Sequence, residues 1–196
     1  MSCPEPTMSV AAAVAATRFA MAEDSVAVLT MSALAYWQEP RTQDFRLVGT
    51  MGAAASIGLG IAIGAPERQV VVVDGDGSLL MQLAVLPAVG TARTANFAHV
   101  VIDNGVYAIS GAQPTPSPAN WVGLFLAAGY VSAHACDTPD DLRDALLDGS
   151  PGPRALVARC LRERPNYPKG AFAIVPEDEA RRVRASLNKQ VVSSDR

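Results

Sequence analysis

The chain has little charge, few aromatic residues and almost no histidine. Asp, Glu, Lys and Arg make up 18% of its 196 residues, Phe, Trp and Tyr 6%, and there are two histidines. With 16 basic and 19 acidic residues, the net charge is −3 at pH 7. A chain without a basic excess is not expected to bind nucleic acid or an anionic membrane. The hydrophobic fraction of 49% excludes a disordered chain, and the length suits one domain.

Cysteine is also scarce. The three cysteines, Cys3, Cys136 and Cys160, are odd in number and widely spaced, so we expect reduced thiols in a cytoplasmic protein. The cysteines and histidines have no zinc-site spacing. Residues 1–17 lack the basic stretch that opens a signal peptide, and we expect a surface helix there.

One uncharged stretch, residues 47–66, is long enough to span a bilayer. It is rich in glycine and alanine, which favours a buried helix of small residues, expected over residues 51–63, rather than a membrane span. Its glycines resemble those of a dinucleotide fingerprint. However, they precede a strand instead of following one, so we do not expect a nicotinamide cofactor.

Apolar runs and helical segments alternate along the chain. We expect strands at residues 25–30, 69–73, 98–102, 130–135 and 155–160. Besides 51–63, we expect helices at residues 79–92 (bent at Pro87), 121–128 and 139–147, and a last helix that opens at Pro176. This alternation predicts a parallel α/β sheet. We expect one domain over residues 1–188 and a frayed tail at 189–196.

The motif that points to chemistry is Val-Val-Val-Val-Asp-Gly-Asp-Gly-Ser, residues 70–78. A buried strand ends at a turn where Gly75 and Gly77 let the backbone approach a ligand, and a helix begins near Ser78. Ligands of parallel sheets bind beyond the carboxyl ends of the strands, and a helix N-terminus there suits a diphosphate. Asp76 would repel that anion unless a cation lies between them, and magnesium fits because it takes oxygen ligands from side chains and phosphates.

A second ligand for such a cation is expected at the end of a neighbouring strand. Asp103 and Asn104 stand directly after the expected strand at 98–102. Two ordinary turns would also use Gly, Asp and Asn for their backbone tolerance, so this alternative stays open. The two histidines, His99 and His134, fall within expected strands, and a structural role is favoured over a catalytic one.

Several motifs in this order resemble the thiamine diphosphate-dependent 2-oxoacid decarboxylases. Gly-Asp-Gly at 75–77 followed by Asn104 is similar to the cofactor signature of the family. Residues 49–60 resemble its Gly-x-Met-Gly segment, and residues 110–115 a stretch of the sulfopyruvate and phosphonopyruvate decarboxylases. The resemblance covers about residues 25–160. It implies the thiamine diphosphate-binding fold of a PP domain, a three-layer sandwich with a mostly parallel sheet.

The resemblance also implies thiamine diphosphate and Mg²⁺ as cofactors and gives roles to the matching residues. Magnesium would be held by Asp76, Asn104 and the Val106 carbonyl. The implied cofactor-binding residues are Gly49, Met51, Gly75, Asp76, Gly77, Ser78, Asn104, Val106 and Ile109. Met51 would act in catalysis by imposing a bent shape on the cofactor, although it would also suit the core as a gap filler. Gln113 is a candidate for substrate contact, the alternative being a turn built by neighbouring prolines.

The chain departs from the family at three places. Asp103 precedes Asn104 where the family more often has two asparagines. Ala53 stands where the phosphonopyruvate type tends to have His, and residues 30–37 carry no charge. These departures weigh against a sulfonate or phosphonate among the small 2-oxo acids that are candidate substrates.

In the family, a glutamate from a separate pyrimidine-binding (PYR) domain activates the cofactor. Only about 24 residues precede the first expected strand, so we expect that glutamate from an α-type partner chain in a hetero-oligomer. The chain would then be the β-type subunit of a heteromeric decarboxylase similar to sulfopyruvate decarboxylase. The alternatives are a subunit of an acetolactate synthase-like carboligase and a non-catalytic cofactor-binding subunit.

Overall fold

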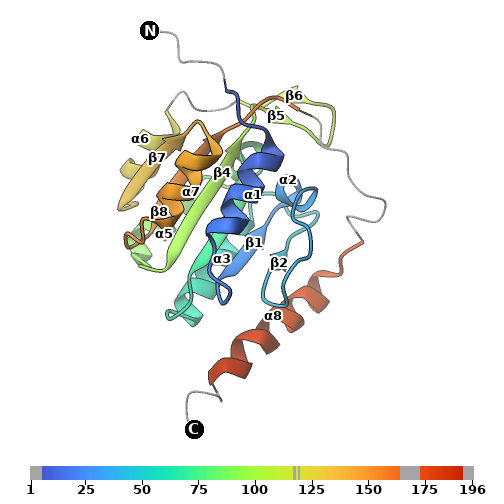
Figure 1. The fold of residues 1–196 in the computed structure, drawn as a ribbon, viewed down its shortest axis with the longest axis vertical. Coiled ribbons are helices and arrows are strands. Elements are labelled where there is room, and N and C mark those ends of the chain that lie inside the picture. The colour runs from blue at the N-terminus through green and yellow to red at the C-terminus, as the bar shows by residue number, and fades with distance from the viewer. Residues whose placement is uncertain (1–5, 117, 119, 164–172, 192–196) are drawn as a thin grey trace.

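A parallel sheet forms the middle layer of the molecule (Figure 1). The computed structural model describes residues 6–116, 118, 120–163 and 173–191. In this part of the chain the six strands lie in the order β2-β1-β3-β4-β8-β7, and every neighbouring pair is parallel. The strands are β1 (Val26–Leu29), β2 (Phe45–Arg46), β3 (Val70–Gly75), β4 (Phe97–Asp103), β7 (Ser132–Cys136) and β8 (Arg154–Arg159).

Helices cover both faces of this sheet, which confirms the predicted three-layer α/β fold (Figure 1). One face packs against α1 (Val10–Ala20), α2 (Met31–Leu34) and α7 (Pro139–Leu147). The other packs against α3 (Ala54–Gly64), α5 (Val85–Ala92) and α6 (Trp121–Ala127). The remaining elements are α4 (Asp76–Leu80), α8 (Pro176–Val191) and an antiparallel hairpin of β5 (Val106–Tyr107) and β6 (Gln113–Pro114).

The central strand β3 explains why the sequence folds in this way. Val70 and Val72 face the layer of α3, whereas Val71 and Val73 face the layer of α1, and none of the four is exposed. β-Branched side chains pack well on a pleated surface, and burying each one stabilises the fold by about 1.5–3 kcal/mol. A continuous apolar run is therefore the pattern of a strand covered on both sides.

The prediction of one continuous helix at residues 79–92 is wrong. The chain forms α4, which begins at Asp76 instead of near Ser78, then a turn, and then α5. The break lies at residues 81–84, before Pro87 and not at it. Pro87 stands in the first turn of α5, where its missing N–H costs no helical hydrogen bond.

The small-residue helix begins three residues later than expected, at Ala54. The preceding loop contains Gly49 and Gly52 with φ of 78° and 86°, a left-handed conformation that glycine adopts without strain. One face of α3 is buried against the sheet, and a Cβ on Gly58 would lie 2.2 Å from Val72 Cγ2. The other face, which includes the exposed Ile63, is open within this chain, so its burial stays a prediction that depends on a partner chain.

Helix α8 lies beside β2 at the edge of the sheet (Figure 1). Glu179 in its first turn accepts hydrogen bonds from Arg46 Nη2 at 2.5 Å and from Arg182 Nη2 at 2.6 Å. Burial alone would raise the pKa of Glu179, but these hydrogen bonds hold it below its usual value. The helix extends into the segment 189–196 for which we expect fraying, and residues 192–196 lie outside the described part.

Two further expectations concern the thiols and the membrane. Cys136 and Cys160 are free, and burial raises the pKa of each to about 12, whereas Cys3 lies outside the described residues. Among the helices that the structure describes, none combines the length and apolar character needed to cross a membrane.

Candidate functional site

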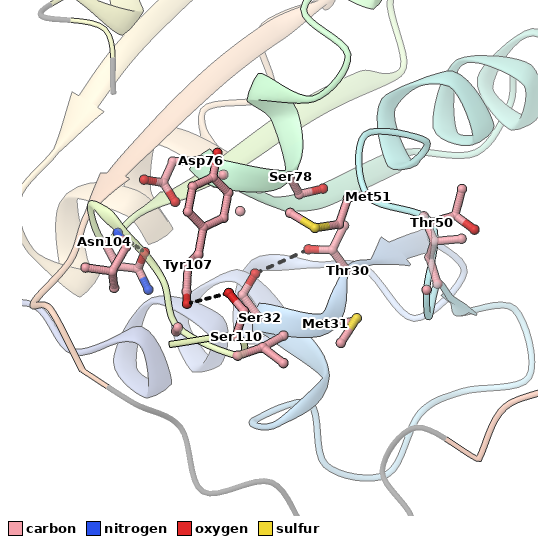
Figure 2. Close-up of a pocket in the computed structure, with 17 residues that line it drawn as sticks. Thr30, Met31, Ser32, Thr50, Met51, Asp76, Ser78, Asn104, Tyr107 and Ser110 are labelled. Carbon is pink, nitrogen blue, oxygen red and sulfur yellow. Dashed lines mark hydrogen bonds between the residues drawn. The ribbon is translucent and has the colours of Figure 1, made fainter. Parts of the chain in front are cut away.

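A pocket of about 170 Å³ lies beyond the carboxyl ends of β1, β3 and β4 (Figure 2). All nine residues expected to bind the cofactor line it, although they come from three stretches of the sequence. They are Gly49, Met51, Gly75, Asp76, Gly77, Ser78, Asn104, Val106 and Ile109. The other lining residues are Thr30, Met31, Ser32, Leu47, Thr50, Tyr107, Ala108 and Ser110.

Asp76, at the start of α4, is the most constrained side chain of the pocket. It is 2% exposed, and its Oδ2 accepts hydrogen bonds from Thr115 Oγ1 at 2.6 Å and from the Gly105 N–H at 3.1 Å. Burial raises the pKa of Asp76 to about 6, and the charge of Asp103 adds to this, although the hydrogen bonds oppose it. A neighbouring cation would favour the ionised form of this carboxyl group.

Asn104 stands directly after β4. It lies close to Asp76, since the N–H of the next residue, Gly105, donates a hydrogen bond to the Asp76 carboxylate. The Asn104 Oδ1 accepts a hydrogen bond from the Val106 N–H at 3.2 Å, and the Val106 carbonyl accepts one from the Ala108 N–H at 3.0 Å. Each carbonyl-type oxygen keeps a second lone pair. Figure 2 shows Asp76 and Asn104 at one end of the pocket and Thr50 and Met31 at the other.

These oxygen donors fit Mg²⁺ better than a softer metal. Magnesium is bound through one or two carboxylates together with phosphate and water, and it does not need a cage of charged side chains. Within the described residues, no three His, Cys, Asp or Glu side chains gather into a ligand cluster. A cation at this turn would therefore have Asp76 as its charged ligand and neutral oxygens as the others.

The two glycines of the turn are places of close approach. A Cβ on Gly77 would lie 2.6 Å from Cε1 of Tyr107, and a Cβ on Gly75 would lie 2.6 Å from Oγ of Ser32. Either contact would force a neighbour to move, so glycine at these positions lets the turn, the hairpin and the end of β1 converge. Tyr107 and Ser32 thus shape the pocket although neither was predicted from the sequence.

The loop before α3 is joined to the same turn. The Gly52 N–H donates a hydrogen bond to Ser78 Oγ at 3.1 Å, which holds residues 49–52 against the start of α4. Met51 is 46% exposed and lines the pocket (Figure 2). It is therefore not a core residue.

Gln113 is the one predicted site residue that lies outside the pocket. Its side chain is exposed on β6, where Oε1 accepts a hydrogen bond from Ser110 Oγ at 3.2 Å. The hairpin directs Gln113 back to its own loop, next to the pocket residue Ser110, and its contact with substrate stays a prediction. The polar side chains that face the pocket instead include Thr30 and Ser32, whose hydroxyl oxygens lie 3.4 Å apart, and Ser110 (Figure 2).

Comparison with known proteins agrees with this geometry. Residues 25–156 match the family described as thiamine pyrophosphate enzyme, C-terminal TPP binding domain. A phosphonopyruvate decarboxylase from Streptomyces viridochromogenes is 44% identical over 153 residues, which cover 76% of this chain and 38% of that protein. A sulfopyruvate decarboxylase subunit beta from Methanococcus maripaludis is 29% identical over 151 residues, covering 76% of this chain and 80% of that subunit.

Among solved structures, benzoylformate decarboxylase from Polynucleobacter necessarius has a TM-score of 0.62 and 20% sequence identity. The match covers 79% of this chain and 33% of that one, and it shows a shared fold. The chain thus spans 38% of the length of the phosphonopyruvate decarboxylase and a third of the benzoylformate decarboxylase, but most of the sulfopyruvate decarboxylase subunit.

Proposed function

The chain belongs to the thiamine pyrophosphate enzymes, as a C-terminal TPP-binding domain, and on this premise we propose that it is the diphosphate- and magnesium-binding subunit of a heteromeric 2-oxoacid decarboxylase. Its resemblance to sulfopyruvate decarboxylase subunit beta supports the assignment. The observation that carries the proposal is the meeting of Asp76 and Asn104 at one end of a pocket whose walls include the Gly-x-Met-Gly loop.

In this proposal Asp76, the Asn104 amide oxygen and the Val106 carbonyl hold magnesium. Thiamine diphosphate, when bound, supplies the electron sink that decarboxylation of a 2-oxo acid requires. The hydrogen bonds from Thr115 and Gly105 fix the Asp76 carboxylate before any ligand arrives, so little ordering of this group accompanies binding.

The backbone of the turn receives the diphosphate. Gly75 and Gly77 carry no side chain that would keep an anion away from the turn, and Ser78 adds a hydroxyl group at the same place. Leu47 and Met51 contribute apolar side chains to the rest of the pocket. The exposed position of Met51 supports its role beneath the cofactor.

An α-type partner with a PYR domain completes the site. Asp76 is the only carboxylate among the described residues that line the pocket, so the activating glutamate comes from elsewhere. Apolar side chains at the pocket, Met51 at 46% and Ile109 at 43% exposure, suit coverage by a second chain. The substrate is a small 2-oxo acid that reaches the pocket at this interface.

Calorimetric titration with thiamine diphosphate, with and without Mg²⁺, tests the binding site. Asp76→Ala removes the one charged ligand, so we expect it to abolish the magnesium-dependent part of the affinity. Asp140→Ala, which changes an exposed carboxylate on α7, is the matched control and should titrate like the wild type. Unchanged affinity in Asp76→Ala would refute the assignment of the metal site.

Turnover of a panel of 2-oxo acids tests the division of the active site. We expect the purified chain alone to release little carbon dioxide, and the chain with its co-purified partner to release it together with an aldehyde. Full turnover without any partner contradicts the shared site. A hydroxyketone as the main product from pyruvate indicates a carboligase instead.

A further inference from the structure

Three polar side chains are buried behind the turn between β3 and α4, and the proposed mechanism uses none of them. Asp74 and His99 are 0% exposed and Tyr130 is 4% exposed. Asp74 stands at the end of β3, His99 lies on the neighbouring strand β4, and Tyr130 precedes β7. Buried polar groups are costly unless they are hydrogen-bonded, so this group calls for an explanation.

The distances form a chain that leads to the turn. Tyr130 Oη lies 3.1 Å from His99 Nδ1, and His99 Nε2 lies 3.9 Å from Asp74 Oδ2. The other carboxylate oxygen, Asp74 Oδ1, accepts a hydrogen bond from the Gly75 N–H at 2.9 Å. Asp74 Oδ2 and His99 Nε2 have no hydrogen-bond partner among the described residues, and the 3.9 Å that separates them is longer than a hydrogen bond.

The chemistry of the three groups selects one arrangement of protons. Burial, and secondarily the charge of Asp74, raises the pKa of Tyr130, so its hydroxyl group keeps its proton and can donate it to His99 Nδ1. The same hydroxyl could also accept from an Nδ1–H, but the Asp74 carboxylate 3.9 Å from Nε2 favours a neutral imidazole with its single proton on Nε2. The opposite tautomer would bring the Nε2 lone pair against that carboxylate.

The position of the ring is also fixed. Phe97 and Phe125 contact His99 edge-to-face, with ring centroids 6.0 and 5.5 Å from that of the imidazole. Such packing leaves the imidazole little freedom to rotate, so its hydrogen-bonding atoms have defined directions.

We propose that His99 is a positioning residue for the diphosphate-binding turn: its Nε2–H, 3.9 Å from Asp74 Oδ2, orients the carboxylate that accepts the hydrogen bond from the Gly75 N–H. The peptide that follows Gly75 carries Asp76, so the orientation of Asp74 determines how the metal-binding side chain leaves the backbone. The ligand of the turn is taken from the proposed function, whereas the row of polar contacts from Tyr130 through His99 to Asp74 does not depend on it.

Nitrogen-15 NMR of the chain labelled in histidine, without cofactor, tests the tautomer directly. His134 is exposed and gives the comparison signal, which a His134→Gln variant assigns. In the neutral ring we expect His99 to carry its proton on Nε2, and Tyr130→Phe to mix the two tautomers. A proton on Nδ1, or an imidazolium at His99, overturns the proposal.

Two variants separate positioning from packing. Glutamine places its amide nitrogen near the position of Nε2 and can still donate to Asp74, whereas asparagine places its amide nitrogen near Nδ1 and cannot. Both remove the ring, so both should lower the urea midpoint similarly. In titrations with thiamine diphosphate and Mg²⁺, we expect His99→Asn to lose about tenfold in affinity or more, and His99→Gln to stay within about threefold of the wild type.

The controls distinguish this proposal from the function on which it draws. His134→Asn should bind thiamine diphosphate and Mg²⁺ like the wild type, because the His134 side chain is exposed and takes no part in the contacts that lead to the turn. Equal losses in His99→Gln and His99→Asn mean that the ring is only structural and refute positioning. If the wild type itself fails to bind, the proposed function is wrong, and the NMR measurement still decides the proton arrangement.

Discussion

Substituting Gly77 with alanine tests the geometry of the pocket with the smallest possible change. The added Cβ would lie 2.6 and 2.7 Å from Cε1 and Cδ1 of Tyr107, and 3.0 Å from Cγ2 of Thr115. Non-bonded carbon atoms rest about 3.5–4.0 Å apart, so the Tyr107 ring must move by about 1 Å and Thr115 must give way as well. Thr115 also holds the Asp76 carboxylate, so the strain reaches the proposed metal ligand.

The expected cost differs between stability and binding. Overpacking costs about 1–3 kcal/mol, but alanine is favoured over glycine within a helix by about 0.5–1 kcal/mol. Tyr107 is only half-buried and can move, so we expect a net loss of about 1 kcal/mol in the free energy of unfolding. A hydrogen bond to a charged group contributes about 1.5–3 kcal/mol, so displacing Thr115 should weaken binding of thiamine diphosphate with Mg²⁺ by about tenfold or more.

Urea denaturation and calorimetric titration of the same samples measure the two quantities. Gly60→Ala is the matched control, because no atom lies within 4 Å of its Cβ position on α3. It should raise the unfolding free energy by about 0.5–1 kcal/mol and leave cofactor affinity unchanged. Tyr107→Ala removes the ring that the new Cβ would meet. The double variant of Gly77→Ala and Tyr107→Ala should therefore lose less stability and less cofactor affinity than the sum of the losses in the two single variants. Wild-type affinity in Gly77→Ala, or strictly additive losses, would refute the close approach.

Two further predictions concern the scaffold. Gly58→Ala puts a Cβ 2.2 Å from Val72 Cγ2 inside a packed layer, and we expect it to destabilise the fold by about 1–3 kcal/mol, which lowers the Tm by roughly 2–12 °C in thermal unfolding. Glu179 has a lowered pKa in the folded state because Arg46 and Arg182 bind its ionised form, so its contribution is present above the unfolded-state pKa and is lost as the pH falls through the folded-state pKa. Denaturation at a series of pH values should therefore show a steeper loss of stability below pH 4.5 in the wild type than in Glu179→Gln, and equal slopes would contradict the ion-pair account.

The strong patterns in the sequence predicted most of the fold because they arise from burial. The β-branched run at 70–73 can be satisfied only between two layers of helices, and the sheet follows from the repetition of such runs. Short elements leave no comparable pattern, so the two-residue strands β2, β5 and β6 could not be predicted. The separation of α4 from α5 was hidden because residues 79–92 are mostly apolar, and the break depends on turns such as the hydrogen bond from the Val85 N–H to the Gln82 carbonyl at 3.1 Å.

The proposed site was predictable where it depends on strand ends alone. Asp76 and Asn104 follow strands that prove to be neighbours, and parallel strands bring their carboxyl ends to one edge. Thr30 and Ser32 were missed because their approach to the turn depends on β1 lying next to β3, and strand order is not readable from one sequence. The same holds for Tyr107, whose ring direction is set by the hairpin of β5 and β6.

The turn between β3 and α4 combines flexibility with the need for accuracy. Magnesium demands nearly ideal octahedral geometry, whereas a turn containing Gly75 and Gly77 is the least restrained backbone that a chain can offer. Hydrogen bonds on two sides resolve this conflict. The Asp74 carboxylate holds the Gly75 N–H from within the core, and Thr115 holds Asp76 from the side of the hairpin. Glycine thus leaves room for the proposed ligands, and the polar side chains around the turn provide the rigidity that glycine lacks.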